Sequence, residues 1–411
     1  MSWILWLIVG FVLLDAVVEG YLSWLNTSYM GRPVPTVLSG IYDEEKYRTQ
    51  QNYMRDHKRL SRVSSAVALV VTLVVLLCGL LGWLDGLTAR LVSSPGLQLV
   101  LFIAVITVVS TLIDLPFDYY DTFVIEERYG FNKSTRLTFW LDMVKSLVVS
   151  LVLSGALLWV IELLYEWLGT DFWLVASAVV VSVLVFISLF YSNLIVPLFN
   201  KQRPLEEGEL RDAIEQTARR AGFAMKNIYV IDGSKRSTHA NAYFTGFGAK
   251  KRIVLYDTLI EQLTTDEIVA VLCHEMGHYR HHDTLKLLVA QVLKVVAMLF
   301  VFSLLDGNRE LSEALGGTRE SFALSLSAFG LLFSPIGLLI GPLENYFSRR
   351  YEYRADRFAS SLGFSEALIS GLKKLSANSL VNLTPHPLVV KMTYSHPTLE
   401  QRVLALMRNK C

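Results

Sequence analysis

Seven long apolar stretches are the feature that most limits what this chain can fold into. A helix needs roughly 20 apolar residues to cross a bilayer, and the stretches occupy residues 3–25, 63–84, 97–113, 144–164, 172–198, 285–305 and 322–343. The fifth carries no charge along its whole length, whereas the third is the shortest. The first lacks a basic leader and a small-residue cleavage site, so we expect a retained span and not a signal peptide.

The composition supports the same class of protein. Hydrophobic residues fill 53% of the 411 positions and charged residues only 18%, whereas soluble domains hold about 45–50% and 25%. A net charge of +1 gives no sign of a nucleic-acid partner. Cys78, Cys273 and Cys411 lie too far apart in sequence to suggest a disulfide framework or a thiolate metal site. We therefore expect an integral membrane protein whose first partner is the lipid bilayer.

The distribution of Lys and Arg predicts how the spans are oriented. If the N-terminus lies outside, segments 26–62, 114–143, 199–284 and 344–411 lie inside and hold 32 of the 38 basic residues. The outside segments hold only Arg90, Arg309 and Arg319. We expect an outside or lumenal N-terminus and a cytosolic C-terminus.

Six ionisable residues fall within or at the ends of the apolar stretches. Such residues are costly in lipid and usually face a bundle interior or water. Asp15 and Glu19 lie one turn apart on one face, which suggests a polar cavity within the bundle. For Lys145 and Lys286, an equally good explanation is that the side chain snorkels from near a helix end to the membrane–water interface. The other two are Asp114 and Lys294.

The cytosolic segment 199–284 is the polar part of the chain. It begins with an amphipathic helix pattern at 210–221. Three runs rich in β-branched and aromatic residues, at 227–232, 242–247 and 252–257, predict a small sheet. Thr264 and Glu267 form a capping-box pattern that opens the next helix.

That helix continues as His274-Glu275-Met276-Gly277-His278. Two His at i and i+4 project from one face and can bind one tetrahedral Zn²⁺. Glu275 can take a proton from a water molecule that the metal activates. His281 and His282 follow at spacings that would let either substitute for a ligand, although capping of the helix end also explains them. The competing interpretation of the motif is a pair of solvated surface histidines.

A zinc site of this kind needs a third protein ligand. Glu352 and Asp356 stand at i and i+4 just after the seventh stretch, on the same predicted side as His274. Glu352 is the better ligand candidate, and Asp356 is placed to hold the other ring nitrogen of a ligand histidine. Four nearby arginines also fit a plain charged helix surface. Taken alone, the segment fits the charged surface better. Because the His274–His278 motif still needs a third ligand, the two together favour the metal site.

The zinc motif, the Glu352–Asp356 segment and the pattern of spans together resemble the type I CAAX prenyl proteases, which are integral-membrane zinc peptidases. Further stretches are similar to that family, namely 123–133, 237–243, 251–255 and Ser395-His396-Pro397. The resemblance covers nearly the whole chain. It implies an all-α integral membrane protein with seven transmembrane helices around a chamber and a small cytosolic α+β zinc protease domain.

The resemblance also implies roles for individual residues. His274, His278 and Glu352 would bind one Zn²⁺, and Glu275 would be the general base. His396 would stabilise the tetrahedral intermediate, although by itself it reads as an ordinary loop histidine. An extended peptide would pair along an edge strand that contains Asn241, Ala242 and Tyr243.

We therefore predict a membrane metalloendopeptidase that hydrolyses peptide bonds near the C-terminus of CAAX-type substrates, with or without an isoprenoid. Expected domains are 1–198 (spans one to five), 199–284 (first protease part), 285–346 (spans six and seven) and 347–411 (second protease part). The membrane would be the cytoplasmic one in a prokaryote and the endoplasmic reticulum in a eukaryote. The sequence leaves open the oligomeric state and the roles of Asp15, Glu19 and Lys294.

Two alternatives remain. A membrane-protein quality-control protease without prenyl preference would share every zinc residue. A transporter would also explain charges within spans, but it predicts internal repeats and interrupted helices in both halves. Only the seventh stretch, at Ser334-Pro335-Ile336-Gly337, shows such an interruption.

Overall fold

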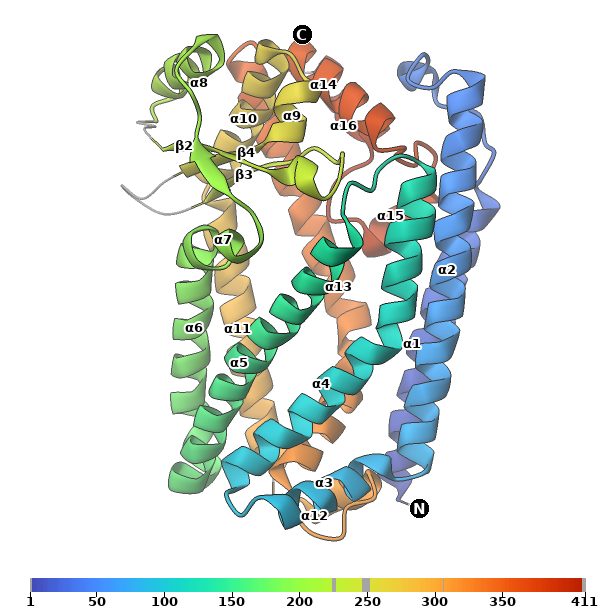
Figure 1. Cartoon of the computed structure of the whole chain (residues 1–411), viewed down its shortest axis with the longest axis vertical. Coiled ribbons are helices and arrows are strands. Elements are labelled where there is room, and N and C mark those ends of the chain that lie inside the picture. The colour runs from blue at the N-terminus through green and yellow to red at the C-terminus, as the bar shows by residue number, and fades with distance from the viewer. Residues whose placement is uncertain (1, 224–226, 246–251, 306, 409–411) are drawn as a thin grey trace.

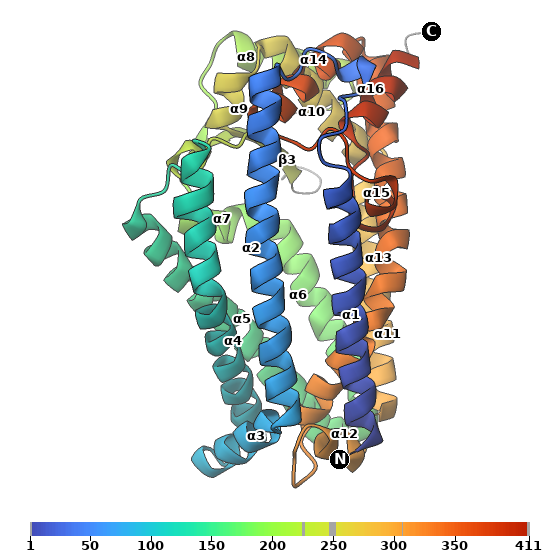
Figure 2. The ribbon, with the colours of Figure 1, turned by 90° about the vertical axis from the view of Figure 1, so that its right-hand side faces the viewer.

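Long helices running side by side make up most of the structure, and a small sheet with shorter helices covers one end of them (Figure 1). The computed structural model describes residues 2–223, 227–245, 252–305 and 307–408. The N-terminus lies at the end opposite the sheet, near α3 (Leu80–Leu91) and α12 (Arg309–Ala314) (Figure 2). The long helices are α1 (Trp3–Ser28), α2 (Glu44–Leu77), α4 (Pro95–Tyr120), α5 (Arg136–Leu168), α6 (Phe172–Leu194), α11 (Asp283–Leu305) and α13 (Phe322–Ser361).

Six segments of the described chain are long and apolar enough to cross a membrane. Five of them each match one predicted stretch, at 3–25, 63–84, 97–113, 285–305 and 322–343. The remaining segment, Arg136–Phe199, contains the predicted stretches 144–164 and 172–198 together. It consists of α5 and α6, joined by a 3₁₀ turn at Gly169–Asp171, and the short α7 (Val196–Phe199). The chain is a mostly helical, multi-pass membrane protein.

The second predicted stretch, 63–84, extends beyond the helix that matches it, and its last residues belong to α3. The helix α2 ends at Leu77, and Gly79 has a left-handed backbone with a φ of 65°, which glycine adopts without steric cost. A Cβ on Gly82 would lie 2.0 Å from the carbonyl carbon of Gly316, so α3 packs directly on the loop after α12. Hydropathy alone did not detect this turn because the glycines that make it are uncharged.

Two helices extend well beyond their apolar stretches into the polar end of the molecule. The helix α2 begins at Glu44, where the Asp43 side chain accepts a hydrogen bond from the Lys46 backbone amide at 2.7 Å. The helix α13 continues to Ser361, through the expected domain boundary between 346 and 347. Glu352 and Asp356 are therefore on the same continuous helix as the seventh apolar stretch.

The sheet has four strands in the order β1-β2-β4-β3. They are β1 (Gln202–Pro204), β2 (Ile228–Ile231), β3 (Ala242–Thr245) and β4 (Arg252–Tyr256). The strand β2 runs parallel to β4, and β1 and β3 pair antiparallel to β2 and β4. The three predicted strands are confirmed over the described residues, and the predicted turn from Gly246 to Lys251 lies outside them. The short β1 was not predicted because its three residues include a charge and a proline.

One apolar core joins the sheet to the helices that carry the polar motifs. The inner strand β4 contributes Ile253 and Leu255, which have no exposed surface, whereas Val254 packs with Val196 and Ile231 in a separate small cluster. Around it pack α8 (Glu209–Arg220), α10 (Thr265–Arg280), α14 (Ser365–Asn378) and α16 (Leu399–Arg408). The predicted helix at 210–221 is α8, and the last predicted helix is α16. This core fixes α10 at the end of the long helices.

The ionisable residues within the spans have distinct surroundings. Asp15 and Glu19 line a cavity of about 640 Å³ between α1 and α2, together with Lys58 and Arg62. Lys294 forms an ion pair with Glu344 across α11 and α13 at 2.8 Å. The remaining lysines donate to backbone carbonyls near helix ends, Lys145 to Leu198 and Lys286 to His281.

Candidate metal centre

The helix α10 presents the zinc motif from a firmly capped start. The Thr264 hydroxyl accepts a hydrogen bond from the Glu267 backbone amide, and the Glu267 carboxylate accepts one from the Thr264 amide at 2.9 Å. The predicted capping box is thereby confirmed. The apolar face of the helix is buried, so His274 is held with 7% of its side chain exposed.

Gly277 lets α10 approach α13 closely at the motif. A Cβ at this position would lie 2.8 Å from the Cα of Ala355, and both Ala355 and Ala359 are fully buried. A glycine within a helix costs roughly 1 kcal/mol relative to alanine. Here it permits a contact that brings His274 and His278 opposite Glu352.

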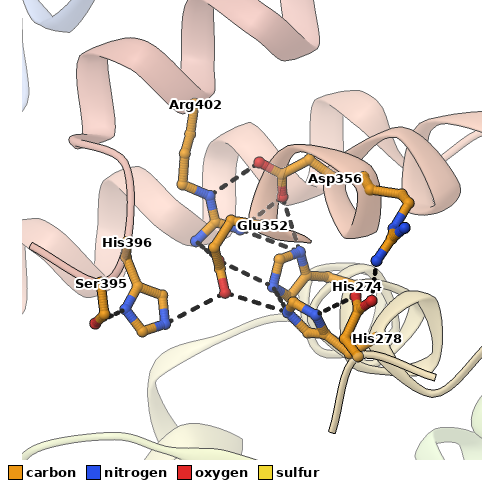
Figure 3. Close-up of polar contacts among 9 residues, drawn as sticks. His274, His278, Glu352, Asp356, Ser395, His396 and Arg402 are labelled. Carbon is orange, nitrogen blue, oxygen red and sulfur yellow. Dashed lines mark hydrogen bonds and ion pairs between the residues drawn. The ribbon is translucent and has the colours of Figure 1, made fainter. Parts of the chain in front are cut away.

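Three side chains converge on one point at this crossing (Figure 3). The Nε2 atoms of His274 and His278 are 3.2 Å apart. The Glu352 carboxylate lies 3.4 Å from the first and 3.2 Å from the second. One ligand atom from each residue lies within 4.8 Å of the others. Oε2 of Glu352 is buried and accepts no hydrogen bond. Two imidazoles and a carboxylate are a donor set that suits Zn²⁺, so the residues fit a metal ion.

Each of these histidines is held at its other ring nitrogen by a carboxylate. Nδ1 of His274 lies 2.8 Å from Asp356, and Nδ1 of His278 lies 3.2 Å from Asp283. Such contacts fix the ring orientation and the tautomer that leaves Nε2 free for a cation. The sequence pattern suggested the first contact, whereas the contact through Asp283 was not predicted.

Arg402, whose side chain is 12% exposed, is a second residue of this group that the sequence did not indicate. Its guanidinium makes two hydrogen bonds with Asp356, at 2.6 and 3.0 Å, and lies 3.6 Å from Glu352. It comes from α16, about 50 residues after the carboxylates. No local motif marks it, and only its position on the buried face of an amphipathic helix could have drawn attention to it.

A cavity of about 550 Å³ opens beside the three converging residues. Glu275 and His396 line it, and His396 Nε2 lies 3.3 Å from Glu352. Asn241 and Ala242 form another part of the wall, so the expected peptide-binding residues lie at the same cavity. Tyr243 points elsewhere, with its hydroxyl 3.3 Å from Ser192.

Two histidines and one cysteine near the motif are separate from this centre. His281 ends α10 as its C-cap, and His282 follows in a left-handed conformation with a φ of 56°. Neither belongs to the converging group. Burial raises the pKa of the Cys273 thiol to about 12, so this neighbour of His274 stays neutral.

A metal-binding group built on a His-Glu-x-x-His helix, at the end of a bundle of apolar helices, defines a membrane-embedded metallopeptidase. Residues 25–201 match the family described as CAAX prenyl protease N-terminal, five membrane helices, and residues 204–410 match peptidase family M48. This chain belongs to the CAAX prenyl protease family of M48 peptidases.

Individual relatives are similar along almost their full length. The CAAX prenyl protease 1 homolog of Arabidopsis thaliana is 33% identical, with 97% of this chain and 96% of that protein covered. CAAX prenyl protease 1 of Saccharomyces cerevisiae is 32% identical, with 97% and 94% covered. The crystal structure of S. mikatae Ste24p has a TM-score of 0.94 at 31% identity and covers 99% of both chains.

Proposed function

We propose that this protein is a zinc endopeptidase that cleaves CAAX-type substrates near their C-terminus and prefers prenylated ones. The observation that carries the proposal is the convergence of His274, His278 and Glu352 beside a cavity bordered by a sheet edge. Relatives that are similar over nearly their whole length bear the name CAAX prenyl protease, which supports the substrate class.

The chain's own residues have distinct roles in this reaction. His274, His278 and Glu352 would hold one Zn²⁺, which polarises the scissile carbonyl and lowers the pKa of water. Glu275 accepts the proton of the attacking water and passes it to the leaving amine. His396 donates a hydrogen bond to the carbonyl oxygen as negative charge develops there.

Peptide binding follows from the position of β3. Within the described sheet β3 pairs only with β4, so its other edge has unpaired backbone groups. Asn241 and Ala242 lie in the wall of the cavity that also holds Glu275. An extended peptide that adds to this edge is fixed by main-chain hydrogen bonds, which explains recognition without one required sequence. Tyr243 would contribute through its backbone.

The membrane part extends this proposal. We infer that α5 and α6 are separate spans, giving seven that enclose a chamber below the metal centre. The strong Lys and Arg bias supports a cytosolic metal centre and C-terminus and an outside N-terminus. The protease parts at 199–284 and 347–411 would then close the cytosolic end. A quality-control protease without prenyl preference is the alternative, because it would share the zinc residues.

Purified protein tests both the chemistry and the substrate class. A farnesylated C-terminal peptide and its unprenylated twin would be offered to the wild type, to Glu275→Gln and to Glu206→Gln, an exposed control. We expect faster cleavage of the farnesylated peptide, one zinc per chain by elemental analysis, and loss of activity in chelator. Glu275→Gln should keep its zinc and lose at least about 10²-fold in kcat.

Each outcome decides one part of the proposal. Cleavage that persists in chelator, or full activity of Glu275→Gln, would contradict the zinc mechanism. Equal rates on the two peptides would retain the protease and favour the quality-control alternative over the prenyl preference.

A further inference from the structure

The segment after α4 contains a polar cluster that the proposed chemistry does not use. Here α4 continues into a π-helix at Asp121–Glu126. This form is rare in proteins overall, and where it occurs it often marks a functional site. At its end the Glu126 carboxylate is 17% exposed and is surrounded by side chains from three parts of the chain. We call this the Glu126 cluster, with members Tyr53, His57, Asp121, Glu126 and His239.

On one side the cluster is anchored to α2. Oε1 of Glu126 accepts a hydrogen bond from the Tyr53 hydroxyl at 2.7 Å and lies 3.2 Å from His57 Nε2. The other ring nitrogen of His57 is 3.1 Å from Asp121. Both nitrogens of this ring face carboxylates, so the ring binds the π-helix at two points.

On the other side Glu126 reaches the loop that leads into β3. Its Oε2 lies 3.4 Å from Nε2 of His239, and the imidazole stacks on Phe131 with ring centroids 4.6 Å apart. The backbone of His239 is fixed as well, because its carbonyl accepts the Thr258 hydroxyl at 3.0 Å. His239 precedes Ala242, the first residue of β3, by three positions.

Backbone pairing reinforces this connection. Asn132 and Ser237 form an antiparallel bridge. The amide of Lys133 donates to the carbonyl of Arg236 at 3.0 Å, and the amide of Thr238 donates to that of Phe131 at 3.1 Å. The chain after the π-helix therefore runs beside the entrance to β3. The side-chain contact through Glu126 ties this pair of segments to α2.

We propose that Glu126 is a positioning residue that, through its contact with His239, fixes the position of the free edge of β3 relative to the cavity. The residues directly after His239 form the cavity wall beside His274 and Glu275. A shift of this wall would move a peptide paired with β3 relative to the reacting atoms, and a displacement of about 1 Å can cost 10²-fold in rate. This inference rests on the proposed function, because it needs a peptide that pairs with β3.

The neighbouring residue Glu127 provides a matched control. Its side chain is exposed and accepts a hydrogen bond from the Asn132 side-chain amide at 2.8 Å. Glu126→Gln removes the charge that both histidines face, whereas Glu127→Gln makes the same chemical change outside the cluster. Tyr53→Phe removes only one hydrogen bond to Glu126, and His239→Gln breaks the contact from the loop side.

Steady-state kinetics would use the farnesylated peptide and the same peptide N-methylated at one backbone amide next to the scissile bond. In wild type we expect the methyl group to lower kcat/KM about tenfold, since it removes one main-chain hydrogen bond. In Glu126→Gln and His239→Gln the unmethylated peptide should be cleaved about tenfold more slowly, and the methyl group should then cost no more than about twofold. Glu127→Gln should behave as wild type, and all variants should hold equal zinc.

The results separate positioning from general structural support. An unchanged methyl effect in Glu126→Gln, or an equal loss on both peptides, would overturn the inference. If Glu126→Gln does not yield folded protein, His239→Gln and Tyr53→Phe carry the same comparison. Wild-type protein that cleaves neither peptide would overturn the proposed function and this inference together, whereas an N-methyl effect shared by wild type and variants overturns this inference alone.

Discussion

At the scale of single residues, the metal centre is built as much by the partners of its ligands as by the ligands. Asp356 accepts from His274 and is bound by the buried guanidinium of Arg402 on two oxygens. The arginine offsets the negative charge that a carboxylate would otherwise bring into a buried place. Ring orientation, tautomer and local charge at His274 are thus set by one Asp-Arg pair.

Replacing Asp356 with Asn should weaken metal binding while leaving the three ligand side chains in place. The amide has the same shape but no charge, so it holds the His274 ring less firmly and leaves Arg402 with a weaker partner. We expect the affinity for Zn²⁺ to fall about 10–100-fold, measured by competition with a fluorescent chelator. Asp212→Asn, exposed on α8, is the control. An unchanged affinity would contradict the role of Asp356.

Replacing His396 with Ala tests the proposed contact with the developing oxyanion. The imidazole is 65% exposed, so its loss should cost little stability. Removal of one such donor should lower kcat about 10²–10³-fold, with little change in KM and full zinc content. His282→Asn is the matched control, because Asn tolerates the left-handed backbone found there. A loss of bound zinc in the His396 variant would instead place His396 among the ligands.

At the scale of elements, the N-terminus of α10 is joined to α14 through Glu267. Lys374 and Ser370 donate to its carboxylate at 2.8 and 2.6 Å. Burial opposes ionisation of this carboxyl, but these donors and the Thr264 amide overcome that cost and lower its pKa. A carboxyl with a lowered pKa stabilises the fold above its unfolded pKa of about 4.3, and this stabilisation is lost as pH falls.

Glu267→Gln should therefore destabilise the protein only when the wild-type residue is ionised. Glutamine retains the capping box but not the charge that Lys374 faces, so we expect a loss of about 1 kcal/mol near pH 7. The difference should shrink as pH falls below about 4.3. Thermal unfolding of both proteins at each pH measures it, and Glu261→Gln, in the neighbouring α9 (Asp257–Gln262), serves as the exposed control. A difference that persists at low pH would contradict the electrostatic explanation.

Features that depend on a local sequence pattern could be predicted, whereas features that depend on contacts between distant parts of the chain could not. The cap at Thr264, the spacing of His274 and His278, and the alternation in β2 and β4 are all local features. In contrast, Arg402 and Glu126 act through partners 46 and 113 residues away, Asp356 and His239. The turn at Gly79 was missed because hydropathy does not register an uncharged glycine with a left-handed backbone, and the packing of Gly82 on Gly316 joins residues far apart in the sequence.

At the scale of the whole molecule, the chain places its chemistry at one end of a long apolar structure. Residues of the candidate metal centre come from α10, α11, α13 and α16, and α13 runs from the far end of the bundle to the metal centre (Figure 1). A single helix therefore carries both the last apolar stretch and Glu352, the third proposed metal ligand.

The orientation in the membrane is the whole-molecule prediction with the clearest physical basis. The end of the bundle near α12 holds few basic residues, whereas the end with the metal centre holds most of them, so the second should face the cytosol. Cysteines introduced at Glu310 and Glu206, both exposed, in a background with Cys78 and Cys411 replaced by Ser, would be treated with a membrane-impermeant maleimide on intact bacterial cells that express the protein in their cytoplasmic membrane. Residue 310 should react at once, and residue 206 only after permeabilisation. Labelling in the opposite order would place the metal centre outside, and would exclude cytosolic substrates from the proposed reaction because they could not reach β3.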